Sequence, residues 1–107
     1  MNKKNDRHSI LIVDDERGTR ETLAKFLRPT YDVTIAEDGE IALNLLKHNN
    51  YDLVLSDIRM PGANGLTILE ATLKLTPQPP CILFTAYGSI ESAVEAMKLG
   101  AFDFVTK

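Results

Sequence analysis

The sequence predicts an α/β domain whose five parallel strands form a doubly wound, flavodoxin-like sheet. Strand-like and helix-like segments alternate along all 107 residues, as in a parallel sheet with crossover helices. Three of the expected strands are continuously apolar, whereas two mix apolar and polar residues. Because central strands of such a sheet are buried on both faces, this difference indicates the strand order 2-1-3-4-5 with right-handed crossovers.

Each expected strand is a short run bounded by loop residues. The continuously apolar runs are the first, third and fourth strands, at 10–13, 53–55 and 81–84. The mixed runs are the second and fifth strands, at 31–36 and 102–105. The proline-rich segment 76–80 is expected to be a loop.

Four helices are expected between these strands. The first covers about 16–28 and is stopped by Pro29, and the fourth runs from about Ser89 to a C′ residue at Gly100. Asp38 and Asn64 are suitable N-caps for the second and third helices. The apolar faces of the four helices comprise Leu23, Phe26, Leu27, Ile41, Leu45, Leu46, Leu66, Leu69, Leu73, Ile90, Val94 and Met97.

Composition excludes several classes of function. A net charge of −3 argues against nucleic-acid contact by this segment, and no apolar run approaches the ~20 residues of a membrane span. Cys81 is the single cysteine, and there is no secretory signal. We therefore expect a single domain, residues 1–107, in a reducing cytoplasm.

Acidic residues follow two of the buried strands. Asp14 and Asp15 follow the first strand and Asp57 follows the third. If these strands are parallel neighbours, the three carboxylates converge at the carboxyl edge of the sheet, where open α/β folds bind ligands. At ~4 Å and an effective dielectric of ~20, each pair repels by about 4 kcal/mol. Either protonation or a bound cation must relieve this repulsion.

Oxygen ligands alone favour a hard cation such as Mg²⁺. Beside such a cation an Asp can attack phosphorus and form an acyl phosphate. Thr85 and Lys107 end the fourth and fifth strands at the same edge, and their hydroxyl and ammonium groups suit phosphate oxygens. Each feature alone has an ordinary structural explanation, but together they indicate a phosphoryl-transfer site.

These motifs resemble the receiver domain of two-component response regulators along the whole chain. They are Val13-Asp14-Asp15-Glu16, residues 52–62, Thr85-Ala86 and residues 100–107. The stretch 87–101 is similar to receivers of the nitrogen-regulation class, which precede a sigma-54-activating AAA+ ATPase and a helix-turn-helix domain. The resemblance implies a CheY-like fold and a signalling domain of a transcription regulator, not a conventional enzyme.

The resemblance also implies the roles of the site residues. Asp57 would accept a phosphoryl group from a sensor histidine kinase, and the domain would promote both its phosphorylation and its dephosphorylation. Mg²⁺, with Mn²⁺ as a substitute, would be held by the carboxylates of Asp15 and Asp57 and the main-chain carbonyl of Arg59. Asp14 would contribute through water, and Lys107 would pair with the phosphoryl group.

Thr85 and Phe104 correspond to the family's switch residues, although Phe104 lacks the hydroxyl of the more usual tyrosine. Repacking of the two would alter the surface of the fourth helix and fifth strand. Arg59 and Tyr87 flank the expected crevice and would tune the lifetime of the phosphoryl group. Ala86 is small and would leave the phosphodonor an open approach.

Two other classes share part of this pattern. A Mg²⁺-dependent phosphohydrolase with an Asp nucleophile usually has Asp-x-Asp after its first strand, whereas this chain has Asp14-Asp15-Glu16. A flavin or nucleotide carrier of similar fold would place hydroxyls or glycines there, and the chain has no glycine-rich phosphate loop. Acetyl phosphate should distinguish these classes from a receiver.

The chain departs from the receiver pattern at its end, because receivers continue past the equivalent of Lys107 into a fifth helix. Exposing ~400 Å² of apolar sheet would forfeit about 10 kcal/mol at ~25 cal/mol/Å², which is comparable to the stability of a whole domain. We therefore expect a fragment of a longer protein whose bare sheet face is covered by another subunit, as in a homodimer.

Overall fold

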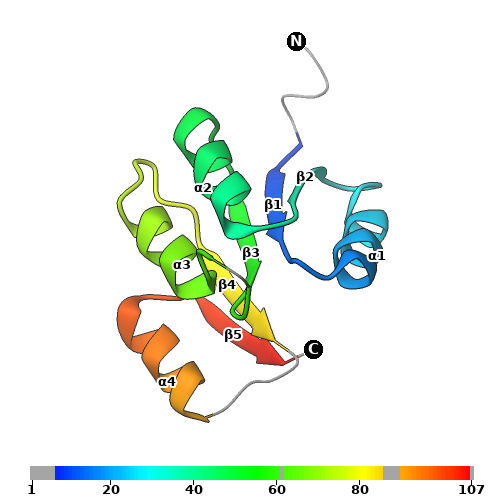
Figure 1. Cartoon of the computed structure of the whole chain (residues 1–107). Coiled ribbons are helices and arrows are strands. Elements are labelled where there is room, and N and C mark those ends of the chain that lie inside the picture. Colours follow the sequence, from blue (N-terminus) through cyan, green and yellow to red (C-terminus); the bar gives the residue numbers. More distant parts are fainter. Residues whose placement is uncertain (1–6, 61, 86–89, 107) are drawn as a thin grey trace.

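Five parallel strands form one sheet in the order β2-β1-β3-β4-β5 (Figure 1). The computed structural model describes residues 7–60, 62–85 and 90–106, without the side chains of Ile90 and Ser92. The strands are β1 (Ser9–Val13), β2 (Asp32–Ala36), β3 (Leu53–Asp57), β4 (Cys81–Thr85) and β5 (Asp103–Thr106). The strand order expected from the alternation of buried and mixed runs is confirmed.

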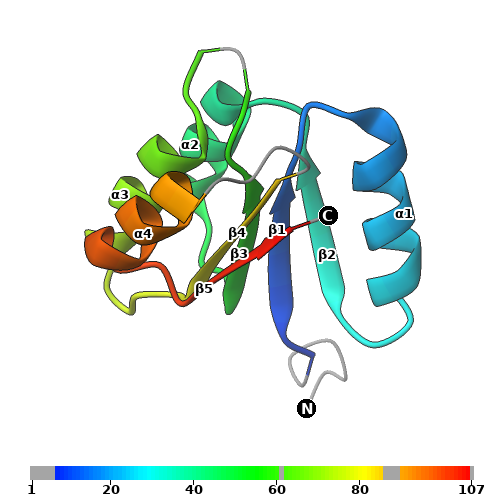
Figure 2. The ribbon, with the colours of Figure 1, turned by 90° about the horizontal axis from the view of Figure 1, so that it is seen from below.

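The helices lie in two unequal layers. They are α1 (Arg17–Leu27), α2 (Gly39–His48), α3 (Gly65–Leu73) and α4 (Ile90–Leu99). Within the described residues, α1 covers one face of the sheet, whereas α2, α3 and α4 cover the other (Figure 2). None of these helices combines the length and the apolar character needed to cross a bilayer.

The predicted caps of α2 and α3 are confirmed. The Asp38 carboxylate accepts a hydrogen bond from the backbone N–H of Ile41 at 2.8 Å. The Asn64 side chain accepts from the N–H groups of Leu66 and Thr67 at 3.0 and 3.1 Å. Gly100 follows α4 with φ of +114°, a left-handed conformation that glycine adopts without steric cost.

The two sheet faces bury separate apolar clusters. Leu11, Val54 and Leu83 belong to the larger cluster, which packs under α2, α3 and α4. Ile10 and Ile12 point to the opposite face and pack with α1. Alternate residues of β1 therefore contribute to both cores, as expected for a central parallel strand.

Cys81 is a core residue, as predicted, with 2% of its surface exposed. Burial raises the pKa of the Cys81 thiol to about 12. Because the thiolate is the reactive form of cysteine, this raised pKa and the burial favour a structural role for the side chain.

Two side chains expected on the apolar faces of α1 and α2 are exposed. Ile41 is 40% exposed because the buried stripe of α2 passes through Ala42 and Leu46, one position further along the chain. Phe26 is 81% exposed. It lies one turn beyond Leu23 on an edge of α1 that no other described helix covers. The prediction that these two residues face the core is wrong.

The apolar face expected for α4 is also largely open to solvent. Val94 and Met97 are 46% and 47% exposed, and Ala96 is the buried residue of this helix. Phe102, directly before β5, is exposed as well, whereas the exposed Val105 of β5 lies on the α1 side of the sheet. The α4–β5 edge of the domain thus presents an apolar surface. The expected start of this helix at Ser89 lies outside the described residues.

An open groove of about 720 Å³ runs between α1 and strands β3, β4 and β5. Its apolar lining comes mainly from the sheet, on the face that carries only α1 among the described helices. The principal lining residues are Thr22, Leu23, Leu55, Ile82, Phe84 and Val105.

Candidate metal centre

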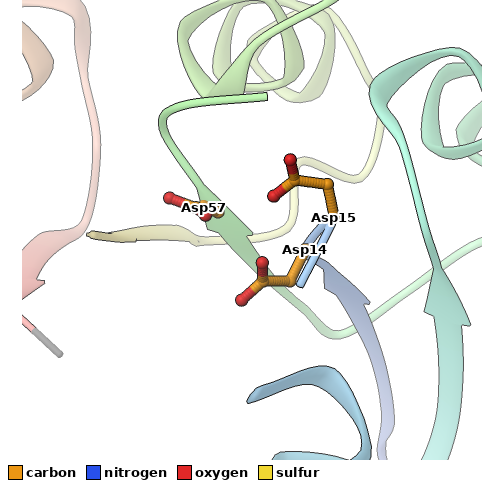
Figure 3. A group of neighbouring side chains, drawn as sticks. All are labelled: Asp14, Asp15 and Asp57. Carbon is orange, nitrogen blue, oxygen red and sulfur yellow. The ribbon is translucent and has the colours of Figure 1, made fainter. Parts of the chain in front are cut away.

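Three carboxylates meet at the carboxyl edge of the sheet (Figure 3). Asp14, Asp15 and Asp57 each offer one oxygen, and these oxygens lie within 4.8 Å of one another. Asp14 and Asp57 are buried, with 0% and 5% of their surfaces exposed, whereas Asp15 is exposed. The convergence expected from sequence is therefore present in the structure.

Strand register explains this convergence. Val13 of β1 lies beside Ser56 of β3, so the next residue along each strand is an aspartate. Asp57 lies beside Phe84 of β4, and Thr85 lies beside Thr106 of β5. Side chains that are distant in sequence are consequently brought to one edge by the parallel pairing alone.

The corner after β1 is held by hydrogen bonds from the main chain. The N–H of Asp14 donates to the carbonyl of Ala36 at the end of β2, at 3.2 Å. The Asp14 carboxylate accepts from the N–H of Glu16 at 2.9 Å. These contacts fix the direction of the acidic pair as the chain turns from β1 into α1.

The segment after β3 is fixed in a similar way. The Asp57 carboxylate accepts from the N–H of Arg59 at 3.3 Å, and the buried Ser56 hydroxyl donates to the Asp57 carbonyl at 2.9 Å. Ile58 donates its N–H to Phe84 and accepts from the N–H of Gly65, at 3.2 and 3.0 Å. The chain on both sides of Asp57 is therefore anchored to neighbouring elements.

The other predicted site residues divide into those inside and those outside the described part of the chain. Thr85 is buried at the end of β4. Phe104 is half-buried and packs against the larger core cluster, to which Ala96 of α4 also belongs. Arg59 is exposed, and its main-chain N–H contacts the Asp57 carboxylate. Lys107, Ala86 and Tyr87 lie outside the described residues.

The donor set suits a hard divalent cation. Only oxygen atoms are offered, and Mg²⁺ prefers one or two carboxylates together with waters. At 4.8 Å and an effective dielectric of about 20, two carboxylates repel by about 3.5 kcal/mol. A bound cation would convert this repulsion into attraction.

Comparison with known proteins agrees with this geometry. The model of the response regulator receiver domain family matches residues 10–107. Response regulator protein PilR of Pseudomonas aeruginosa is 42% identical over 102 residues, which cover 94% of this chain and 23% of PilR. Transcriptional regulatory protein ZraR of Escherichia coli K12 is 40% identical over 103 residues, 95% of this chain and 23% of ZraR.

A solved structure is similar over the same region. It is a response regulator protein from Burkholderia pseudomallei with a phosphorylated aspartic acid, a calcium ion and citrate. The TM-score is 0.86 at 30% identity, over 94% of this chain and 59% of that one.

These matches, together with the sheet order and the acidic edge, define a signalling domain of the two-component type. The chain belongs to the response regulator receiver domain family. The predicted similarity to receivers of sigma-54-activator response regulators is confirmed. The family match favours neither the phosphohydrolase nor the flavin or nucleotide carrier. The chain spans about a quarter of the length of these curated relatives.

Sequence reasoning missed two glycines that shape the site. Gly65 begins α3 directly after the Asn64 cap, and a Cβ there would lie 2.4 Å from the carbonyl oxygen of Asp57. Gly39 begins α2 after Asp38, and its Cβ would lie 2.0 Å from the carbonyl oxygen of Ala63. In both cases the glycine directly follows the N-cap residue, as Asp38-Gly39 and Asn64-Gly65, and this repeated pair was the sequence signal that could have identified them.

The Gly65→Ala substitution should destabilise the fold and displace Asp57, because the new methyl group would clash with the main-chain carbonyl of Asp57. We expect a loss of about 1–3 kcal/mol in the free energy of unfolding, measured by urea denaturation. Gly18→Ala is the matched control, since no atom lies within 4 Å of its Cβ and α1 should gain helix propensity. Equal stabilities of the two variants would contradict this description of the β3–α3 segment.

Proposed function

We propose that Asp57 is the phosphoacceptor of this receiver and that its phosphorylation by a sensor histidine kinase requires Mg²⁺. The observation that carries the proposal is the gathering of three carboxylate oxygens within 4.8 Å at the ends of β1 and β3. The phosphorylated aspartate and calcium ion of the Burkholderia pseudomallei protein support it.

The reaction would form an acyl phosphate. A carboxylate oxygen of Asp57 attacks phosphorus, the phosphorus–nitrogen bond of the phosphohistidine breaks, and the electron pair leaves with the imidazole. Asp15, Asp57 and the Arg59 carbonyl would hold the Mg²⁺, with Asp14 assisting through water, and the cation would neutralise the charge that repels the phosphoryl group.

Two further residues would hold the phosphoryl oxygens. The Thr85 hydroxyl would donate a hydrogen bond, and the Lys107 ammonium would supply a positive charge. Arg59 and Tyr87 would control access of water to the acyl phosphate, and Ala86 would leave the donor's approach open. Thr85 lies in the strand next to Asp57, which supports its role.

Incubation with acetyl phosphate and Mg²⁺ should add one phosphoryl group, about 80 Da, to Asp57 by intact-protein mass spectrometry. Asp57→Asn and chelation of Mg²⁺ should each abolish the adduct. The matched control Asp32→Asn, on the exposed amino end of β2, should retain it. In Arg59→Ala the adduct should decay at a changed rate.

Continuous release of phosphate without a stable adduct would instead indicate a phosphohydrolase. Absence of both adduct and turnover in a folded protein would contradict the proposal.

We propose that phosphorylation acts on the α4–β5 surface. Phosphorylation adds about −1.5 to −2 charge beside Thr85. Phe104 packs against the cluster that contains Ala96 of α4, so a change in the Phe104 rotamer would change the packing of that helix. Exposed Val94, Met97 and Phe102 supply the apolar area through which an output region could respond.

Beryllofluoride with Mg²⁺, a mimic of the phosphoryl group, should therefore change amide exchange in α4 and β5 and alter affinity for the output region. Thr85→Ala should suppress both effects, whereas the control Thr22→Ala, exposed on α1, should not. Identical affinity and exchange with and without the mimic would argue decisively against this surface.

The output region belongs to the longer protein that the relatives suggest. PilR and ZraR are named as response and transcriptional regulators, and the chain resembles sigma-54-activator receivers. We therefore propose an AAA+ ATPase and a helix-turn-helix domain in a cytoplasmic transcription regulator. The receiver itself would make no direct contact with nucleic acid.

The groove beside α1 gives a prediction about assembly. We propose that a second copy of this chain covers its apolar sheet residues, including Leu55, Ile82 and Val105. The thermal midpoint should then rise with protein concentration, because association stabilises the folded state by mass action. Val105→Asp should weaken this dependence. A cooperative monomer melt that is independent of concentration would refute the dimer.

A further inference from the structure

Arg20 is an unusual basic residue in this fold. It is 8% exposed, whereas every other lysine and arginine in the described part of the chain is exposed. Burying a guanidinium group carries a large desolvation cost unless its polar atoms gain partners. An aliphatic side chain would fill the same space in α1 without that cost, so packing alone does not explain the arginine.

The contact of the Arg20 side chain is specific. Its Nη1 donates a buried hydrogen bond to the main-chain carbonyl of Asp14 at 3.0 Å. Among the residues that the structure describes, its Nε has no hydrogen-bond partner. Within the described residues, the hydrogen bond of this buried guanidinium group is therefore made to one atom, the carbonyl oxygen of Asp14.

That carbonyl belongs to the peptide unit that joins Asp14 to Asp15. Because the peptide group is planar, holding its oxygen also limits rotation of the N–H and Cα of Asp15. The N–H of Asp14 is bound to Ala36, and the Asp14 carboxylate accepts from Glu16. The Arg20 bond adds a third restraint on this corner, at the peptide that leads into Asp15.

We propose that Arg20 is a positioning residue for the divalent cation. It fixes the Asp14–Asp15 peptide so that both carboxylates face Asp57 before the cation arrives. The inference rests on the proposed Mg²⁺-dependent function and extends it to a residue in α1 that touches neither the cation nor the phosphoryl group. Outer partners of this kind orient ligands and contribute to metal affinity.

Titration calorimetry of the protein with Mg²⁺ alone tests the proposal. Arg20→Met keeps an unbranched apolar stem but removes the guanidinium donor, and it should raise the Kd for Mg²⁺ about 10-fold. Arg17→Met is the matched control, because Arg17 lies on the same helix, is exposed and pairs with Glu21. Its affinity should equal that of the wild type.

A second measurement separates positioning from general loss of structure. In the metal-free protein, Arg20→Met should accelerate amide exchange at Asp15 and Glu16 while leaving β3 and β4 protected. Arg20→Lys keeps one donor without the planar guanidinium, so its Kd should fall between those of the wild type and Arg20→Met.

Wild-type Mg²⁺ affinity in folded Arg20→Met would overturn the inference. If Arg20→Met does not fold, Arg20→Lys decides: a raised Kd supports the inference and an unchanged Kd overturns it. The wild-type titration separates the two proposals. Absence of Mg²⁺ binding there would contradict the proposed function itself, whereas binding that is insensitive to Arg20 would contradict only the positioning role.

Discussion

Mutual repulsion among Asp14, Asp15 and Asp57 is the constraint on which the rest of this structure depends. Two of these carboxylates are buried, and all three offer oxygens within 4.8 Å of one another. A fold selected for stability alone would not gather negative charge in this way. In the proposed function, a bound divalent cation would make this arrangement favourable, and the same geometry that repels in the metal-free fold would serve phosphoryl transfer.

Parallel strand pairing and hydrogen bonds of the adjoining loops together maintain this geometry. The register of β1 and β3 sets the carboxylates side by side. Hydrogen bonds from neighbouring backbone then fix the two loops, and the close approach of Gly65 to Asp57 joins the start of α3 to the same edge. The α4–β5 edge differs, because apolar side chains such as Val94, Met97 and Phe102 remain exposed there.

Much of this could be predicted because it depends on local pattern. Continuous and mixed apolar runs gave the strand order, cap residues gave the starts of α2 and α3, and carboxylates after two buried strands gave the acidic edge. Ile41 and Phe26 were assigned to the core incorrectly, since neighbouring apolar positions on a helix differ by about 100° and only the packed fold selects between them. The cap-glycine pattern could have pointed to Gly65, whereas the burial of Arg20 and its hydrogen bond to the Asp14 carbonyl depend on a tertiary contact that no local pattern contains.

A crystal grown with Mn²⁺ offers the most direct test of the central claim, because the anomalous signal of manganese locates the cation without assumptions about its ligands. If the acidic edge binds the cation as proposed, one strong peak should lie between the carboxylates of Asp15 and Asp57, beside the carbonyl of Arg59. A well-ordered acidic edge with no peak there, or a peak at another site alone, would contradict it.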